Sequence, residues 1–145
     1  MEDLKLTRQG RYFALFVGEN WMPEYPIVPI AKPRMSRSDR WRKRPATAKY
    51  WHFVDLCKLH RVQFPCFGSH VTFVLPLPKS QSKKRNAAMC GKPHMNRPDL
   101  SNLIKALEDA IYKEDSVIYD IWATKIWGKE GKIIIGDRIR DRPED

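Results

Sequence analysis

Acidic residues are scarce in this chain, and one long stretch has none. Asp and Glu number 17 against 27 Lys and Arg over 145 residues, which gives a formal net charge of +10. No acid stands between Leu56 and Pro98. Such an excess of positive charge attracts polyanions over a long range, so a nucleic acid is the expected partner. An anionic membrane surface is the competing polyanion.

Long apolar runs and cysteines are scarce as well. No apolar segment approaches the roughly 18 residues of a spanning helix, and no signal peptide opens the chain, so we expect a cytoplasmic protein. Three irregularly spaced cysteines argue against a disulfide framework. A zinc site is a weaker alternative, because the loop between its two ligand pairs is far shorter than in common zinc fingers. Its four ligands would be Cys57, His60, Cys66 and His70.

The pattern of apolar residues predicts one domain with an α+β fold. The length fits a single domain of about 100–150 residues. Strands are expected from β-branched and aromatic runs at residues 11–17, 26–30, 70–76 and 117–127, and the last continues through a turn at Gly128 and Gly131 into a hairpin partner. Apolar residues at helical spacing predict helices at residues 47–62 and 99–113. The expected architecture is a small mixed β-sheet with two main helices packed on one face, which leaves the other face for DNA or a second copy of the chain. Residues 1–25 are expected to form an N-terminal extension and residues 137–145 a charged tail.

Two basic runs flank the centre of the chain. Residues 32–49 carry eight Lys and Arg with a single acid, Asp39, and residues 79–97 carry six with no acid. Such runs are usually solvated surface, but two of them in one basic protein favour phosphate binding. Trp41 could stack on an unpaired base, although a position in the core is favoured. The predicted phosphate contacts are Lys32, Arg34, Arg37, Lys79, Lys83, Lys84, Arg85 and Arg97.

Acids cluster where the second helix is expected. Six of them stand between residues 99 and 120. A rotation of about 100° per residue puts Asp99, Lys105 and Asp109 on one polar stripe, and the short loop to Asp115 could bring its carboxylate back to Asp99. Two carboxylates suit Mg²⁺ and phosphodiester hydrolysis, with Lys105 neutralising charge in the transition state. The simpler alternative makes Asp99 an N-cap and Asp109 a helical partner of Lys113.

The segment from Pro78 to Asp115, PKSQSKKRNAAMCGKPHMNRPDLSNLIKALEDAIYKED, resembles the central signature of RusA-type Holliday junction resolvases. In that family Lys-Pro-Asp-Leu-Asp-Asn-Leu-x-Lys begins a helix, an Asp recurs four residues after the Lys, and an Asp-Asp pair follows. The matching positions here are Arg97 to Lys105, Asp109, and Glu114 with Asp115. The upstream IAKPRMSRS is also similar, and the resemblance covers most of residues 26–135.

The resemblance implies a homodimeric, Mg²⁺-dependent endonuclease that binds four-way DNA junctions by shape and nicks two strands of like polarity. Such enzymes act in recombination and repair and are often encoded by bacterial phages. Carried over to this chain, Asp99 and Asp115 are the metal-binding carboxylates, Lys105 is the essential lysine, and Lys125 occupies a position that often carries a lysine and is expected to contact DNA.

One departure from the family pattern concerns Ser101, which stands where the family has its second metal-binding aspartate. A hydroxyl is a much weaker magnesium ligand than a carboxylate, so cleavage could weaken, shift toward Mn²⁺ or be lost. The main alternative is therefore a structure-selective DNA-binding protein with the same fold. A third is a basic RNA-binding or ribosome-associated protein, since composition alone does not separate DNA from RNA.

Overall fold

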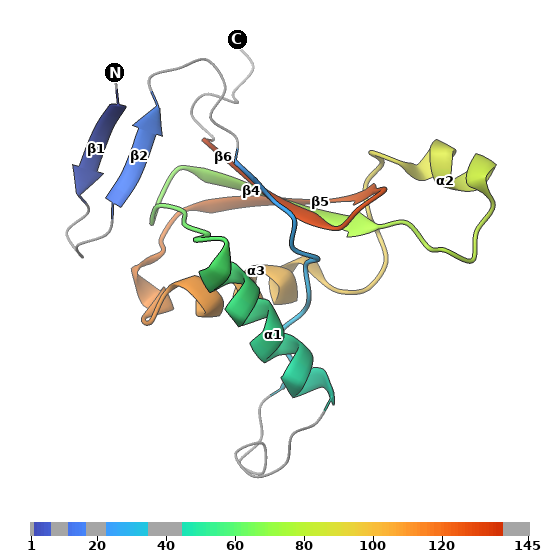
Figure 1. The fold of residues 1–145 in the computed structure, drawn as a ribbon, viewed down its shortest axis with the longest axis horizontal. Helices are drawn as coiled ribbons and strands as arrows, with labels where there is room; N and C mark the ends of the chain where they lie inside the picture. Colours follow the sequence, from blue (N-terminus) through green and yellow to red (C-terminus); the bar gives the residue numbers. More distant parts are fainter. Residues whose placement is uncertain (1, 7–11, 17–22, 35–44, 138–145) are drawn as a thin grey trace.

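A mixed sheet of four strands forms the centre of the molecule (Figure 1). The computed structural model describes residues 2–6, 12–16, 23–34 and 45–137. The strand order is β3-β6-β4-β5, and β1 and β2 form a separate antiparallel pair. The strands are β1 (Glu2–Leu6), β2 (Tyr12–Phe16), β3 (Glu24–Tyr25), β4 (Ser69–Pro76), β5 (Ile121–Gly128) and β6 (Lys132–Asp137). The helices are α1 (Pro45–Leu59), α2 (Lys83–Met89), α3 (Leu100–Ile111) and the 3₁₀ turn η2 (Asp115–Val117).

Strand β4 is the central strand, and its sequence explains why. It pairs in parallel with β5 and antiparallel with β6, so both of its edges are hydrogen-bonded. Alternate residues Val71, Phe73 and Leu75 are buried, as expected when one face of a strand points into the core. Val74, on the opposite face, is also buried. A central position between two neighbouring strands buries the apolar side chains of such a strand.

The predicted hairpin of the last two strands is wrong. Strands β5 and β6 lie on opposite sides of β4, and the three residues between them cross its end. Glycine is required at this crossing, because a Cβ on Gly131 would lie 3.0 Å from the Cα of Val28. The turn residues were identified correctly, but a turn does not specify which strand its flanks will pair with.

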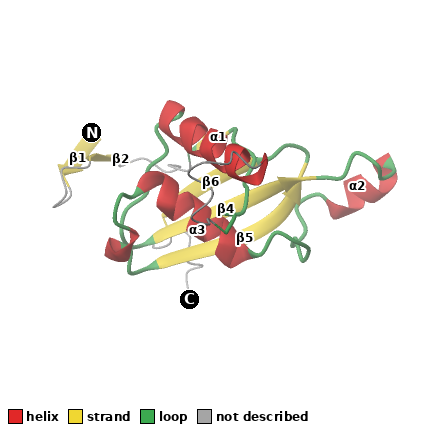
Figure 2. Ribbon diagram, turned by 90° about the horizontal axis from the view of Figure 1, so that it is seen from below, coloured by secondary structure: helices red, strands yellow, loops and turns green. Residues whose placement is uncertain are grey.

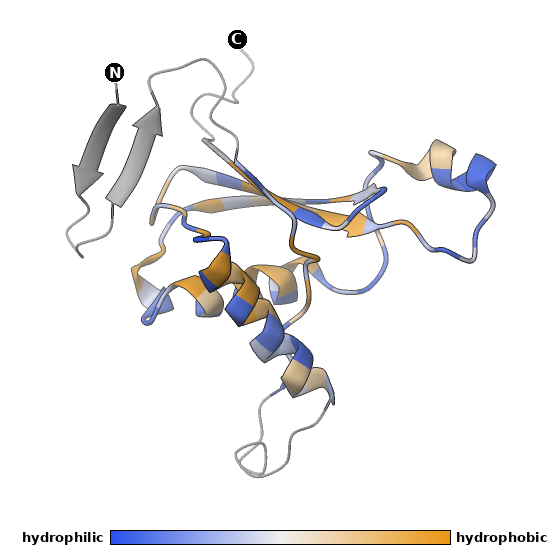
Figure 3. Ribbon diagram, viewed as in Figure 1, coloured by the Kyte–Doolittle hydropathy of each residue, from blue (hydrophilic) through white to orange (hydrophobic). Residues whose placement is uncertain are grey.

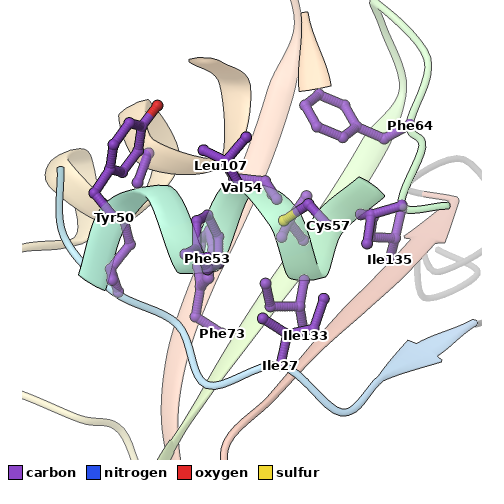
Figure 4. Close-up of a cluster of buried hydrophobic side chains, with 14 of the residues drawn as sticks. Ile27, Tyr50, Phe53, Val54, Cys57, Phe64, Phe73, Leu107, Ile133 and Ile135 are labelled. Carbon is purple, nitrogen blue, oxygen red and sulfur yellow. The ribbon is translucent and has the colours of Figure 1, made fainter. Parts of the chain in front are cut away.

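Helices α1 and α3 pack together on one face of the sheet (Figures 1 and 2). Helix α1 contributes buried Tyr50, Phe53, Val54 and Cys57, which meet residues of the sheet such as Phe73 and Ile133 (Figure 4). Helix α3 adds Leu103, Ala106 and Leu107. Each fully buried large apolar side chain contributes about 1.5–3 kcal/mol, so this layer holds the helices on the sheet.

The predicted fold class is confirmed: an α+β domain with a small mixed sheet and two main helices on it. The expected helices at 47–62 and 99–113 and the strand at 70–76 match α1, α3 and β4. The strand expected at 26–30 is wrong, since Pro26 and Pro29 have no N–H for a ladder and no strand forms there. Its Ile27 is nevertheless fully buried. Among the described residues, no helix has both the length and the apolar character needed to cross a bilayer.

Candidate active site

The N-terminus of α3 presents an exposed carboxylate. Asp99 occupies the N-cap position with extended backbone angles, and its backbone carbonyl accepts hydrogen bonds of 3.1 Å from the N–H groups of Asn102 and Leu103. Its side chain makes no capping hydrogen bond. The helix therefore starts at the predicted residue, but the Asp99 carboxylate remains open to solvent instead of closing the helix end.

Lys105 and Asp115 form the ion pair at the centre of the candidate site. The ammonium of Lys105, from the middle of α3, donates to Oδ2 of Asp115, the first residue of η2. This hydrogen bond is the main cause that lowers the pKa of Asp115 and raises the pKa of Lys105. Both groups are therefore held in their charged forms, and the structure brings together two of the three predicted catalytic residues.

Asp109 extends this pair into a chain of alternating charge. Its Oδ1 lies 3.4 Å from the Lys105 ammonium, and its Oδ2 accepts from the ammonium of Lys32. The backbone N–H of Lys32 also donates to the carbonyl of Asn102, so the 23–34 segment is fixed against α3. We refer to Lys32, Asp109, Lys105 and Asp115 as the charge chain. Lys113, the partner expected for Asp109, is not the one observed.

Glu108 adds a third acid beside the charge chain. Partial burial raises its pKa first, and the negative charges of Asp115 and Asp109 raise it further, against the opposing effect of Lys105. Sequence reasoning gave this residue no role and left that of Asp109 uncertain. The available signal for Asp109 was its spacing of four residues from Lys105, which places the two on one helical face.

That the carboxylates of Asp99 and Asp115 meet stays a prediction. The carboxylate of Asp115 contacts Lys105 and Asp109, while Asp99 and the exposed Ser101 lie outside the charge chain at the start of α3. Among the described residues, no three His, Cys, Asp or Glu side chains gather closely enough to hold a metal ion. The donors still fit Mg²⁺ in kind, because magnesium takes oxygen ligands and is often held by one or two carboxylates with water and phosphate. A cation at Asp115 would compete with the Lys105 ammonium.

The segment before Asp99 is held by Lys125 of β5. Its ammonium donates to the carbonyl oxygens of Asn96 at 2.6 Å and Pro98 at 2.7 Å.

Nearby, His94 is buried with its ring centroid 4.0 Å from that of Trp127, and its Nδ1 has no hydrogen-bond partner. Burial first, and then the positive charge of Lys125, lowers the pKa of His94, so its ring is neutral near pH 7.

The residues predicted to contact DNA fall into three groups. Lys32 is held in the charge chain and Lys125 on backbone carbonyls, whereas Arg37 and Trp41 lie outside the described residues. The others are exposed: Arg34, Lys79, Lys83, Lys84, Arg85 and Arg97.

Four of the exposed cations stand on a projecting lobe that we term the basic arm, residues 78–90. It extends beyond the end of the sheet and carries α2, which buries no residue (Figures 1 and 2). Its two ends are fixed to β5, since the N–H of Leu77 donates to Gly128 and that of Gly91 donates to Trp127. The first turn of α2 is strongly hydrophilic (Figure 3). The arm therefore presents positive charge on a short helix with fixed ends.

The structure disfavours the zinc alternative. Cys57 lies in the core against α3 and the sheet, and burial raises the pKa of its thiol to about 12. A zinc ligand must be a thiolate, which is strongly disfavoured at this position near neutral pH. Cys57, Cys66 and Cys90 are all free.

Comparison with known proteins agrees with this architecture of a small basic α+β domain. Residues 24–136 match the model of the family described as Endodeoxyribonuclease RusA. The chain belongs to the RusA family, whose activity is that of an endodeoxyribonuclease that resolves Holliday junctions. The match begins at β3 and ends at the penultimate residue of β6, so it includes all four strands of the sheet except that last residue, and every residue of the charge chain. No curated protein and no solved structure matches the chain.

Proposed function

We propose that this protein is a metal-dependent endodeoxyribonuclease that cuts four-way DNA junctions by paired phosphodiester hydrolysis, in recombination and repair in the cytoplasm of a bacterial or phage-infected cell. The observation that carries the proposal is the ion pair between Lys105 and Asp115 in a chain of the RusA family. These residues are ten positions apart, on a helix and on the turn after it, and they are two of the three that the family pattern assigns to catalysis.

In this proposal Asp99 and Asp115 hold Mg²⁺, or Mn²⁺ in its place, and Ser101 is at most a weak third ligand. The ion would polarise the scissile phosphate and lower the pKa of a bound water. Lys105 would neutralise negative charge that develops on the phosphate, and Asp109, 3.4 Å from its ammonium, would keep that ammonium oriented. The open Asp99 carboxylate and the charged Asp115 support this assignment.

We further propose that the basic arm and the cations before α3 bind the junction backbone. The exposed Lys79, Lys83, Lys84 and Arg85 have no acid near them in sequence to neutralise their charge. Each phosphate contact releases counterions, so affinity should fall steeply with salt.

Two cuts in strands of like polarity require two active centres related by a twofold axis, which a homodimer supplies. Light scattering of the purified protein tests the dimer.

The direct test is incubation of the purified protein with a synthetic four-way junction in Mg²⁺ or Mn²⁺. We expect symmetrically placed nicks with wild type and none with Asp99→Asn or Lys105→Met. Asp55→Asn, which changes an exposed acid on α1 far along the chain from these residues, is the matched control and should cut like wild type. Uncut junction with both metals would exclude the nuclease.

A second candidate is a junction-binding protein that has lost cleavage. Two observations favour it: Ser101 replaces a carboxylate, and the charge of Asp115 is already balanced by Lys105. Wild type would then bind the junction without cutting, and Ser101→Asp should introduce metal-dependent nicks. Ser101→Asn is the control, because an asparagine side chain has nearly the size of aspartate but no charge, and this variant should remain inactive.

A further inference from the structure

The segment that joins the basic arm to α3 has no helix and lies along the outer edge of β5. Three backbone hydrogen bonds fix its first half: Gly91 N–H to Trp127, Trp127 N–H to Lys92, and His94 N–H to Lys125, at 2.8–3.0 Å. No backbone bond of this kind is seen for residues 95–98 among the described residues. The second half, which leads directly to Asp99, therefore depends on side-chain contacts.

Lys125 supplies that contact. Its side chain shares a face of β5 with Ala123, which packs against the core, because alternate residues of a strand point the same way. The stem therefore runs along the helix-covered side of the sheet, and the ammonium reaches the carbonyls of Asn96 and Pro98. Pro98 is the residue immediately before Asp99, so one ammonium holds the segment up to the candidate ligand.

The Lys125 ammonium is bound differently from that of a typical surface lysine, which is mainly solvated by water. An ammonium has three N–H donors, and two of them are used by carbonyl oxygens at short distance. No carboxylate pairs with Lys125 among the described residues, so its charge stays uncompensated beside the start of α3. Lowering of the His94 pKa by this charge is consistent with that view.

We propose that Lys125 is a positioning residue that fixes the 96–98 segment and thereby sets where the Asp99 carboxylate stands, and that it is not a phosphate contact. The effect on cleavage rests on the proposed function, but the effect on the start of α3 does not. Lys125→Met keeps the length of the stem and leaves all three backbone bonds of the segment in place. It removes the two bonds closest to Asp99.

The first experiment measures amide hydrogen exchange by NMR without DNA or metal. In Lys125→Met, the amides of Asn102 and Leu103, which donate to the Asp99 carbonyl, should exchange about tenfold faster, as loss of a charge-assisted hydrogen bond predicts. The amide of Tyr112, at the other end of α3, should not change. The matched control is Lys132→Met, which removes a strand lysine paired with Glu24 at the far side of the sheet. Unchanged exchange at Asn102 and Leu103 would overturn the proposal, whatever the protein does to DNA.

The second experiment separates positioning from phosphate binding. Junction affinity is measured in EDTA over a range of salt concentrations, where loss of one phosphate contact flattens the slope of log K against log salt by about 0.9. Lys125→Met should keep the wild-type slope, while Lys83→Met in the basic arm should flatten it. A slope flattened in Lys125→Met as much as in Lys83→Met would show that Lys125 contacts phosphate and would refute the proposal.

If wild type cuts, a third readout becomes available. Lys125→Met should raise the Mg²⁺ concentration for half-maximal cutting about tenfold with the junction Kd unchanged, and Lys125→Arg, whose guanidinium can also donate to two carbonyls, should restore most of the loss. If wild type does not cut, the proposed function fails and the exchange experiment still decides the role of Lys125.

Discussion

The charge chain makes a quantitative prediction for Asp109→Asn. The substitution keeps the size of the side chain and removes the charge that two ammonium groups share. The largest loss of stabilising energy is expected from the ion pair of Asp109 with Lys32. The Lys32 side chain is 28% exposed and that of Asp109 is 17% exposed, so solvent screens this pair weakly. Hydrogen bonds to charged groups contribute about 1.5–3 kcal/mol, and the amide oxygen can keep part of this as a neutral bond.

The second partner of Asp109 matters less. Lys105 is half exposed and its ammonium lies 3.4 Å from Asp109, a geometry worth about 0.3–0.5 kcal/mol. Together we expect Asp109→Asn to lower the free energy of unfolding by about 1–2 kcal/mol. At roughly 2–4 °C per kcal/mol for a domain of this size, Tm should fall by about 2–8 °C.

Urea unfolding at 25 °C measures this change, and a double-mutant cycle with Lys32→Met isolates the pair. The coupling between the two positions should account for most of the loss, because the single variants remove the same contact. Asp55→Asn, an exposed acid on α1, is the control and should stay within about 0.5 kcal/mol of wild type. Additive effects of Asp109→Asn and Lys32→Met would refute the reasoning.

Three further predictions follow from the same structure. Leu107→Ala, which empties a fully buried position between α3 and the sheet, should cost about 2–5 kcal/mol in urea unfolding. Joint replacement of Lys83, Lys84 and Arg85 by Met should flatten the salt dependence of junction binding by up to about 2.7, at roughly 0.9 per phosphate contact, and leave Tm within a few degrees, since α2 buries nothing. The lowered pKa of His94 means that the unfolded chain binds its proton more readily, so stability is full above the unfolded pKa of about 6.5 and falls as pH drops below it. His94→Gln should reduce this acid-side fall in Tm, and an unchanged pH profile would contradict the assignment.

The parts of the fold that sequence predicts well are those with local causes. Leu100, Leu103, Ile104 and Leu107 follow the period of a helix, and α3 begins directly after Asp99, as expected. The same holds for β4, whose β-branched residues lie in an alternating run. Pairing within the sheet has no local cause, which is why the predicted hairpin of β5 with β6 was wrong.

The candidate site divides in the same way. The closeness of Lys105 to Asp115 has a local cause that a sequence can show, because only a short loop joins α3 to η2. The link between Lys32 and Asp109 spans 77 positions, and no local pattern shows that an apparently DNA-binding lysine is committed to an ion pair. The contact of Lys125 with two carbonyl oxygens was missed for the same reason, because every residue has a backbone carbonyl and no side-chain pattern could identify these two.

That separation of 77 positions also bears on how the site forms during folding. Closing so long a loop costs chain entropy before any contact repays it, so contacts of this kind tend to form late. Lys105 can meet Asp115 as soon as one helix and its turn exist, but it obtains its second acidic neighbour in a fixed position only when the far segment has docked. The orientation of the Lys105 ammonium therefore depends on a contact that forms only when segments far apart in the sequence have come together.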